Sequence, residues 1–419
     1  MPTASAFALK GVSSAQRRTL IAAALGWMLD AFDVMLYAMV LAHVMVDLGM
    51  TKGTAGLLNT LTLLASGIGG VLFGLLADRI GRTHALMLSI LTYSVFSFAS
   101  GLATSIAMLA AFRFVLGLGM GGEWNTGATL VAETWPDHLR ARALSIVQSS
   151  WAIGYAAAAL VAGTMLRYYN WRAVFFVGIV PALVTLWIRK GVPEPEMWAQ
   201  HQANRSTAVT HSETPRHGFG LLFSRQYARD TVCLLFLNFF GLFAYWGLFS
   251  WVPAYLSLPV AQGGRGFGLM NSTTLLLVLN LAGMLPGYLC FGWFADRIGR
   301  RRAFMLYLFV AAALVPLYAA SRQQWTLLVM GALVGFFGTG FFSGSALIGS
   351  EIFPTAVRAR ALGFTYNGAR TLSAIAPFVI GRVGQTRGLG GAFYLCAAAF
   401  LLAGFMAMPL PETRGRALQ

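Results

Sequence analysis

Charged side chains are scarce in this chain of 419 residues. They make up 11% of the sequence, against 57% hydrophobic residues. A water-soluble protein of this length needs far more polar surface than such a composition provides. Apolar runs of about 20 residues, long enough to cross roughly 30 Å of hydrocarbon, recur along the whole chain. The sequence therefore predicts an all-α polytopic membrane protein.

Cysteine is also rare, and the residue patterns of several enzyme classes are missing. The three cysteines, Cys233, Cys290 and Cys396, are scattered in apolar segments without the spacing of a disulfide framework. The sequence has no metal-ligand cluster, no Ser-His-Asp order and no glycine-rich nucleotide loop. We expect no metal and no cofactor, and a polytopic membrane enzyme is a remote alternative. The missing nucleotide loop also argues against a pump with its own ATPase.

Acidic residues are fewer than basic ones, 14 against 30, which gives a net charge of +16. Most of the Lys and Arg fall on alternate connections and on the two ends of the chain, as the positive-inside rule predicts for cytoplasmic loops. The basicity is therefore an orientation signal and does not indicate a nucleic-acid partner. We expect a multi-pass protein of the plasma membrane, most simply a bacterial inner membrane, with both termini in the cytoplasm and lipid around it.

Twelve spans can be assigned from the hydropathy pattern. Six of them form an expected bundle over 19–190 and six form a second bundle over 230–409. The remaining segments are an N-terminal cytoplasmic tail, 1–18, a cytoplasmic linker, 191–229, and a C-terminal cytoplasmic tail, 410–419. The individual spans are predicted at 19–46, 56–77, 84–102, 105–131, 143–165, 171–190, 230–256, 272–295, 303–320, 324–349, 360–382 and 388–409.

The two halves of the chain repeat each other. The segment GLLADRIGR at 74–82 returns as GWFADRIGR at 292–300, and ETWPDHLRARALS at 133–145 returns as EIFPTAVRARALG at 351–363. A Pro-Glu pair at 193–194 returns at 411–412, and all three pairs are separated by the same 218 residues. A six-span bundle was therefore duplicated in parallel orientation, as in one class of secondary transporter.

The repeated loop resembles the hallmark motif of the major facilitator superfamily. This resemblance implies two six-helix bundles with a central cavity and alternating access. Glycine permits a tight turn and a close helix approach, while Asp and Arg can form a latch at the cytoplasmic face that holds one gating state. The alternative is a static topology signal. The expected latch residues are Gly74, Asp78, Arg79, Gly81, Arg82, Glu133 and Arg142 in the first half, and Gly292, Asp296, Arg297, Gly299, Arg300, Glu351 and Arg360 in the second.

The fourth span, RFVLGLGMGGEW, places Arg113, Gly117 and Gly121 on one helix face. Glycines at this spacing let a neighbouring helix approach closely. The pattern resembles the fourth-span motif of proton-coupled members of the superfamily. The second half has no charge at the positions equivalent to Arg113 and Glu123, so the charged groups belong to the first bundle.

The first span carries Asp30 and Asp33 within one helical turn near the middle of the membrane. From the rise per residue, Asp33 can reach Arg113 and Asp30 can reach Glu123. Burial favours the protonated form of a carboxyl group and a nearby guanidinium favours the ionised form, so a group whose partner comes and goes can load and unload a proton. The alternative is a permanently paired Asp–Arg strut, and which aspartate titrates stays open.

A closer resemblance is to organic-anion/proton symporters of the superfamily. The sequence DAFD at 30–33 resembles the Asp-Gly-aromatic-Asp pattern of the aromatic acid and sialate families, with Ala31 in place of glycine. Several segments resemble the sialate group, whereas GARTLSAIAP at 368–377 resembles the aromatic-acid group. The substrate is therefore left open among sugar acids, aromatic acids, dicarboxylates and lactate-sized acids.

Arg370 is the one fixed charge predicted deep in the second bundle, and its own helix has no acidic residue. A guanidinium there needs an anion and matches a carboxylate, so we expect Arg370 to receive the substrate carboxylate. The alternative is a bond to backbone carbonyls or to an acidic residue of the other bundle. Tyr366 and Asn367 can add polar contacts from the same helix. Further contacts are expected from residues that, taken singly, are more often packing residues than ligands: Tyr37, Gln148, Trp151, Tyr155, Asn238, Tyr245, Trp246 and Asn280.

The sequence thus predicts a proton-coupled secondary transporter that imports a small organic carboxylate by alternating access, as a functional monomer. The main alternative is an exporter of organic acids or drugs that works by proton antiport on the same fold. A mid-membrane arginine suits anions better than cationic drugs.

Overall fold

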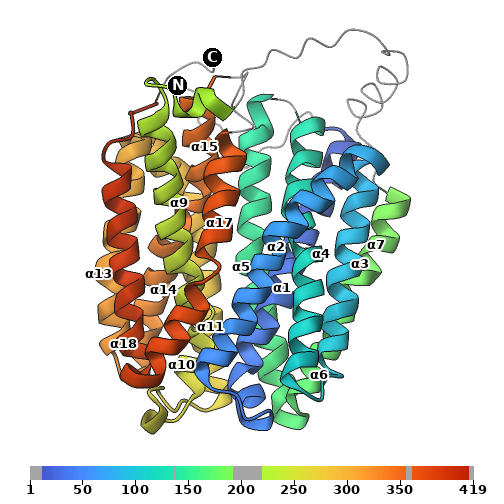
Figure 1. Ribbon diagram of the computed structural model, residues 1–419, viewed down its shortest axis with the longest axis vertical. Coiled ribbons are helices and arrows are strands. Elements are labelled where there is room, and N and C mark those ends of the chain that lie inside the picture. The colour runs from blue at the N-terminus through green and yellow to red at the C-terminus, as the bar shows by residue number, and fades with distance from the viewer. Residues whose placement is uncertain (1–11, 136, 192–218, 355–360, 415–419) are drawn as a thin grey trace.

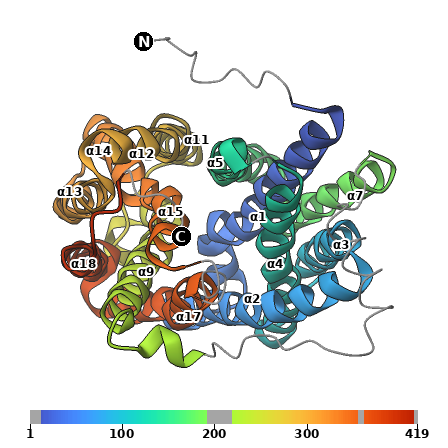
Figure 2. The same cartoon turned by 90° about the horizontal axis from the view of Figure 1, so that it is seen from above.

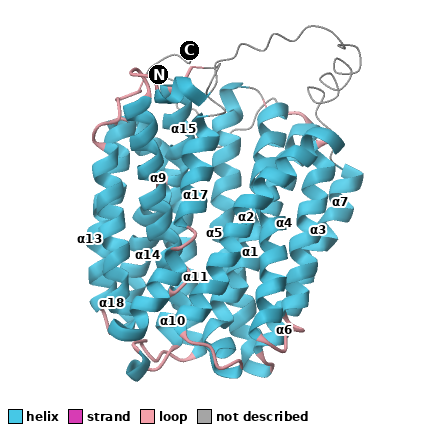
Figure 3. Cartoon of the chain, viewed as in Figure 1, coloured by secondary structure: helices cyan, strands magenta, loops and turns pink. Residues whose placement is uncertain are grey.

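The computed structural model describes residues 12–135, 137–191, 219–354 and 361–414. These residues form helices joined by short turns, and they contain no strand (Figure 3). Residues 192–218 of the expected linker, 191–229, lie outside the described residues.

The first half of the chain contains six spans. The sixth is interrupted by a single turn of 3₁₀-helix. The elements are α1 (Ser14–Asp47), α2 (Lys52–Ile80), α3 (Arg82–Ser100), α4 (Ile106–Thr134), α5 (Asp137–Tyr168), α6 (Trp171–Phe176), η1 (Val177–Ile179) and α7 (Val180–Gly191).

The second half follows the same order, with more interruptions. Two of its segments, η4 and η5, are π-helical turns inside longer helices. The elements are η2 (Phe219–Phe223), α9 (Ala228–Phe249), α10 (Val252–Ser257), η3 (Val260–Gln262), α11 (Leu269–Val278), η4 (Leu279–Met284), α12 (Leu285–Ile298), α13 (Arg300–Ala320), α14 (Gln324–Gly340), α15 (Phe342–Ile352), η5 (Gly363–Asn367), α17 (Gly368–Ser373) and α18 (Ala376–Ala407).

Ten helical stretches of the described chain are long and apolar enough to cross a membrane. A shorter apolar helix, Trp171–Thr185, supplies the sixth span. The stretch Gly363–Ala407 contains two predicted spans, because Gly388 breaks it with φ 71° and ψ 161°. The twelve-span arrangement predicted from the sequence is therefore confirmed.

The repeat is visible in backbone geometry as well as in sequence. Gly81 and Gly299 lie between α2 and α3 and between α12 and α13, with φ of 104° and 100°. Residues that carry a side chain rarely adopt this backbone conformation, so both tight turns require glycine. Close helix approach does not explain the other repeated glycines: a Cβ atom at Gly74 or Gly292 would meet nothing within 4 Å. The predicted packing role of these two glycines is wrong in this structure.

Glycines do bring α2 and α4 into contact. A Cβ atom at Gly117 would overlap the Thr62 carbonyl oxygen, and one at Gly121 would overlap the Ser66 carbonyl oxygen. The two backbones therefore touch, as the spacing in the fourth span predicts. This contact fixes the rotation of α4 and directs Arg113 and Glu123 into the first half.

The two halves stand side by side, with α1–α7 on one side and α9–α18 on the other (Figure 2). Both chain ends lie at the same end of the molecule (Figure 1). At the opposite end α2 packs against α18, and α1 against α10. The halves therefore meet most closely at the end remote from the termini.

Candidate functional site

A small pocket lies between the two halves. Both bundles contribute to its wall: α1 and α5 from the first, and α9, α12, α15, η5 and α17 from the second. The lining residues are Trp27, Gln148, Trp151, Leu242, Tyr245, Trp246, Tyr288, Phe342, Tyr366 and Arg370. The wall is therefore predominantly aromatic and carries one fixed positive charge.

A contiguous row of aromatic rings crosses the boundary between the halves. The ring centroids of Trp27 and Trp151 are 4.8 Å apart, and those of Trp151 and Trp246 are 5.9 Å apart in an edge-on arrangement. The Trp151 indole nitrogen donates a hydrogen bond to the Tyr245 hydroxyl at 2.5 Å. One side of the pocket is thus an aromatic surface shared by α1, α5 and α9.

Arg370 approaches the pocket from α17, directly after the π-helical turn η5. π-helical turns are frequent at functional sites because the extra residue changes which side chains face inward. Here η5 holds Tyr366, which is four residues before Arg370 and therefore on the same helix face. Both side chains line the pocket, and Arg370 is 7% exposed.

Asp30 of α1 is the acidic group that interacts electrostatically with Arg370 across the boundary. It is completely buried, and neither carboxylate oxygen has a hydrogen-bond partner among the described residues. It follows Trp27 of the pocket wall by three residues, so it lies one helical turn farther along α1, on the same face of the helix. Two partners are expected for Arg370, a substrate carboxylate or an acidic residue of the other bundle. Asp30 is a candidate for the second, and the pocket wall that Arg370 lines is the place where the first would bind.

Asp33 is held within the first half. Its Oδ1 accepts a hydrogen bond from the Ser97 hydroxyl of α3 at 2.9 Å, while Oδ2 is unpartnered. It interacts electrostatically with Arg113, but no hydrogen bond joins the two, because the three guanidinium nitrogens have no partner in the described part of the chain. Arg113 instead lies over the Tyr37 ring, with 4.8 Å from Cζ to the ring centroid. A permanent Asp33–Arg113 strut is therefore not formed.

Glu123 of α4 is buried, and its two carboxylate oxygens have no hydrogen-bond partner among the described residues. It packs on Gly26 of α1, where a Cβ atom would overlap Oε1. It also interacts electrostatically with Asp30, one turn farther along α1. The structure thus brings Asp30 and Glu123 together as the sequence suggested.

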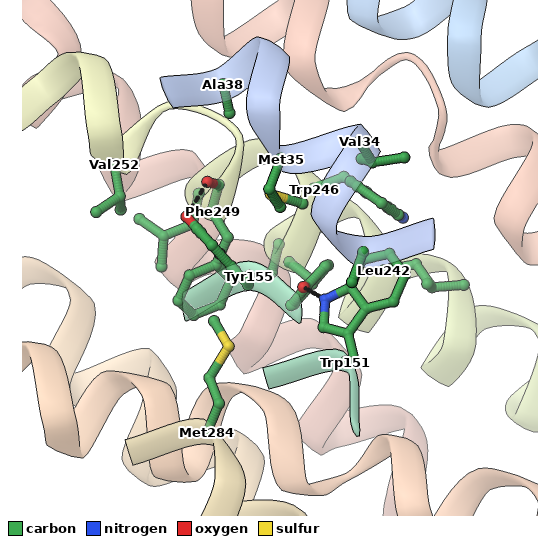
Figure 4. Close-up of a cluster of buried hydrophobic side chains, with 14 of the residues drawn as sticks. Val34, Met35, Ala38, Trp151, Tyr155, Leu242, Trp246, Phe249, Val252 and Met284 are labelled. Carbon is green, nitrogen blue, oxygen red and sulfur yellow. Dashed lines mark hydrogen bonds between the residues drawn. The ribbon is translucent and has the colours of Figure 1, made fainter. Parts of the chain in front are cut away.

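Five of the predicted binding residues do not line the pocket. Tyr37 is fully buried and donates to the Ala55 carbonyl at 3.0 Å, and Asn238 donates to the Thr365 carbonyl at 3.3 Å. Asn367 is exposed on η5. Tyr155 donates to the Phe249 carbonyl of the other half at 2.8 Å (Figure 4). The prediction that these side chains face the cavity is wrong in this conformation, because internal hydrogen bonds hold Tyr37, Asn238 and Tyr155.

Asn280 also misses the pocket, since its amide donates to the Leu276 carbonyl at 2.8 Å within its own helix. Conversely, sequence reasoning missed four lining residues: Trp27, Leu242, Tyr288 and Phe342. Trp27 could have been found, because it lies one turn from Asp30 on the same face of the first span. The other three carry no signal that separates them from packing residues.

The repeated loop of the second half forms a compact charged cluster. The Arg300 side chain bonds to Asp296 and, at 3.3 Å, to Glu351 Oε1, while its backbone N–H donates to Glu412 at 2.8 Å. The Thr413 hydroxyl also donates to Glu351, at 2.5 Å. Three segments distant in sequence, 296–300, 351 and 412–413, are thus joined at the end that carries the termini.

The equivalent residues of the first half can be placed only in part. Arg79 and Arg142 are exposed, and Arg82 lies at the start of α3. In the second half, the Arg297 guanidinium lies over the Trp293 ring, with 5.1 Å from Cζ to the ring centroid. The side chains of Asp78 and Glu133, and all of Arg360, lie outside the described residues.

At the opposite end, side chains of the first half bond to backbone of the second. Lys52, at the start of α2, donates to the Gln262 carbonyl at 2.6 Å and to the Gly384 carbonyl at 3.2 Å. A Cβ atom at Gly56 would overlap the Pro377 carbonyl oxygen, so the backbones of α2 and α18 touch there. Together with the Tyr155–Phe249 bond, these contacts close the pocket on the side remote from the termini.

Several known proteins are similar to this chain over nearly its whole length. The "Probable 4-methylmuconolactone transporter" of Cupriavidus pinatubonensis is 34% identical over 98% of this chain and 94% of its own. The sialic acid transporter NanX of Escherichia coli is 32% identical over 94% and 95%. The cis,cis-muconate transport protein of Acinetobacter baylyi is 31% identical over 91% and 90%.

Solved structures share the fold. A partially occluded, inward-open conformation of the xylose transporter XylE from E. coli superposes with a TM-score of 0.76, covering 97% of this chain and 100% of that one at 18% identity. These relatives and this fold are those of transporters, not of enzymes. The family model of the Major Facilitator Superfamily matches residues 23–284 and 267–418. The chain is therefore a multi-pass transporter that belongs to the major facilitator superfamily.

Proposed function

We propose that this protein takes up a small organic carboxylate together with a proton, by alternating access of the pocket to the two sides of the membrane. The observation that carries the proposal is the placement of Asp30, a buried carboxylate of one half without a hydrogen-bond partner among the described residues, within electrostatic range of Arg370, the cation that lines the pocket from the other half.

The coupling follows from competition for Arg370. When Asp30 is ionised, its negative charge partly neutralises the Arg370 guanidinium. A substrate anion bound at Arg370 would then be repelled by the Asp30 carboxylate. Protonation of Asp30 removes that charge and leaves Arg370 to the substrate. By thermodynamic linkage, a bound anion in turn favours protonation of Asp30 by the same factor. Anion and proton are thus bound together and released together.

The pocket wall favours an unsaturated or aromatic acid over a hydroxylated sugar acid. Its rings from Trp27, Trp151 and Trp246 offer flat apolar faces, while hydroxylated ligands need many hydrogen-bond partners. Two of the relatives are named for muconate-type compounds. We therefore propose a flat carboxylate, with its acid group at Arg370 and its body against the tryptophans.

The transport cycle would be a rocking of the bundles 19–190 and 230–409 in a single chain. We propose that the termini face the cytoplasm of a bacterial inner membrane, since the basic residues gather at that end. The Lys52 contacts then close the outer side, and the Arg300 cluster belongs to the inner gate. Uptake is favoured over antiport because the same protonation that frees Arg370 promotes anion binding.

The test is transport by purified protein in proteoliposomes with an imposed pH gradient. We expect accumulation of radiolabelled cis,cis-muconate or benzoate when the side of uptake is acidic, and much weaker accumulation of sialate. Arg370→Met should abolish binding of the acid, whereas Arg370→Lys should retain part of it. Arg322→Met, which removes an exposed arginine between α13 and α14, is the matched control and should transport normally.

Accumulation only with the opposite gradient would show an exporter and overturn the direction proposed here. Binding that survives Arg370→Met unchanged would overturn the assigned role of this residue. Equal loss of folded protein in both Arg370 variants would show that Arg370 serves structure, not substrate.

A further inference from the structure

Buried polar atoms without partners line the interior of the first half, away from the pocket. Among the described residues, no hydrogen bond reaches the Asp30 carboxylate, Asp33 Oδ2, the Tyr93 hydroxyl, the Ser94 hydroxyl, the Arg113 guanidinium or the Glu123 carboxylate. All six residues are at most 1% exposed. We call this set the polar strip.

Helix geometry explains why these groups lie together. α1 and α3 both run from the end with the termini toward the opposite end, and the Asp33–Ser97 bond sets their register. One turn back toward the termini, Asp30 follows on α1, and Ser94 and Tyr93 follow on α3. Tyr93 is accordingly in electrostatic range of Asp30, Asp33 and Glu123.

α4 closes both ends of the polar strip. Arg113 lies beside Asp33, and Glu123 packs on Gly26, one turn beyond Asp30 on α1. From Gly26 to Asp33 the rise along α1 is about 10 Å. The polar strip thus begins near the middle of the protein and runs about two helical turns toward the end that carries the termini.

Such a set of dry polar groups is too costly to stay unsolvated. Each unpaired buried donor or acceptor costs roughly 1–3 kcal/mol, and an ion costs more. Native proteins satisfy such groups with bound water, which typically makes about three hydrogen bonds per molecule. Hydroxyl and carboxyl groups are the kinds of polar group that such water molecules join.

We propose that the polar strip is a hydrated proton path inside the first half, separate from the substrate pocket, with Tyr93 as the residue that positions its water. A proton on the Asp30 carboxyl passes to a bridging water, that water releases a proton along the chain, and Glu123 accepts one, so that the number of protons is conserved. The Tyr93 hydroxyl donates and accepts hydrogen bonds and stays protonated. The transported proton is therefore shared among three carboxylates, and it leaves without crossing the substrate.

The charged and titratable neighbours of the polar strip come from every element around it. α1 supplies Asp30, Asp33 and Tyr37, α3 supplies Tyr93, and α4 supplies Arg113 and Glu123. Arg370 of the second half reaches only Asp30. Asp30 is thus the residue that belongs to the polar strip and also interacts with the pocket. The direction of proton flow rests on the proposed function, whereas the water path itself does not.

The test uses Tyr93→Phe, which removes the hydroxyl and keeps the ring. The matched control is Tyr307→Phe, which removes a buried hydroxyl that donates to the Gly287 carbonyl in the second half. Infrared difference spectra of the full-length protein in lipid, recorded between acid and alkaline buffer without substrate, report the protonated carboxyl groups. We expect the carboxyl band to shift in Tyr93→Phe and to stay unchanged in Tyr307→Phe.

Transport supplies the second readout. Loss of one hydrogen bond to the path should slow proton-driven uptake of muconate or benzoate by about tenfold. Exchange of labelled for unlabelled acid at equal pH, which needs no net proton transfer, should continue at the wild-type rate. If Tyr93→Phe yields no folded protein, Ser94→Ala takes its place and should likewise slow proton-driven uptake while leaving exchange at the wild-type rate.

The outcomes separate this inference from the proposed function. If Asp30→Asn abolishes accumulation while Tyr93→Phe and Ser94→Ala change neither spectrum nor uptake, the path is wrong and the proposed function stands. If the carboxyl band shifts but no acid is driven by a pH gradient, the path stands and the proposed function fails. Equal slowing of exchange and of proton-driven uptake would mean a structural role for Tyr93 and would overturn the inference.

Discussion

Asp30 of the first half lies within electrostatic range of Arg370 of the second half, and Arg370 lines the pocket at the boundary between the bundles. Neither Asp30 oxygen has a hydrogen-bond partner among the described residues. A buried carboxylate in that position can exchange its charge for a proton without breaking a hydrogen bond to the protein. In the proposed function, this exchange links proton binding to the state of the pocket.

Replacing Asp30 by asparagine should separate binding from coupling. In the wild type, affinity for the acid should be highest at low pH, where Asp30 is protonated, and should fall as the pH rises and the ionised Asp30 competes for Arg370. In Asp30→Asn the affinity should stay high at every pH, while accumulation against a gradient is lost. Titration calorimetry over a pH series measures the first effect, and proteoliposome uptake measures the second.

The control is Asp47→Asn, at the far end of the same helix, where Asp47 pairs with Arg172 at 2.9 Å on a partly exposed surface. It should keep the wild-type pH dependence. The same pH dependence in Asp30→Asn would contradict the competition for Arg370.

Lys52→Met should weaken closure of the end remote from the termini. The substitution removes two charge-assisted hydrogen bonds, each worth roughly 1.5–3 kcal/mol, while keeping the length of the side chain. The population should shift by at least about tenfold toward molecules open at this end. Spin labels at Val46 and Val260, which are 79% and 70% exposed and lie on different halves, report the change as a longer distance in pulsed electron resonance.

Lys52→Arg keeps the charge and should preserve most of the closed population. A distribution that is identical in the wild type and in Lys52→Met would show that the apolar contacts between α2 and α18 suffice for closure.

Two glycine substitutions should differ sharply in stability. Gly121→Ala places a methyl group against the Ser66 carbonyl and forces α2 and α4 apart, which should cost about 1–3 kcal/mol. Gly74→Ala adds the same methyl group where nothing lies within 4 Å, and it should leave stability unchanged. Thermal unfolding in detergent compares the two, and a loss in Gly74→Ala equal to that in Gly121→Ala would contradict the packing described.

The Arg300–Glu351 pair should contribute more than an exposed ion pair. Its side chains are only 12% and 10% exposed, and Glu351 also accepts from Thr413. A double-mutant cycle with Arg300→Met and Glu351→Gln should give a coupling energy of about 1 kcal/mol or more. The Arg172–Asp47 pair, with side chains 30% and 46% exposed, is the comparison and should give less than about 1 kcal/mol. Equal coupling energies in the two cycles would show that burial does not strengthen the Arg300–Glu351 pair.

The elements that could be predicted from sequence are those with a repeating or periodic signal. The 218-residue offset predicted two parallel halves, and Gly81 and Gly299 show the repeat in their backbone angles. Glycines four residues apart predicted a close approach of a neighbouring helix to α4, and the structure shows that this helix is α2. Arg370 stood out because a charge within an apolar helix is expensive unless it is used.

The rotation of each helix could not be predicted. A span that is apolar on all sides gives no preferred face, so Tyr37 and Asn238 were indistinguishable in sequence from Gln148 and Trp151. In the structure, Tyr37 and Asn238 donate hydrogen bonds to backbone carbonyls, whereas Gln148 and Trp151 line the pocket. No sequence pattern predicts these hydrogen bonds. Partners in the other bundle were equally hidden, since Asp30 and Arg370 are 340 residues apart. The packing of the two halves decides that contact.

Closure at the end remote from the termini depends on main-chain oxygens of the second half: Gln262 and Gly384 receive Lys52, and Phe249 receives Tyr155. Every amino acid carries such an oxygen, so mutations at these three acceptor positions leave the attachment points in place as long as the backbone keeps its course. The second half can accordingly vary its side chains during evolution, and with them the substrate that it binds, without losing the contacts that close the end remote from the termini.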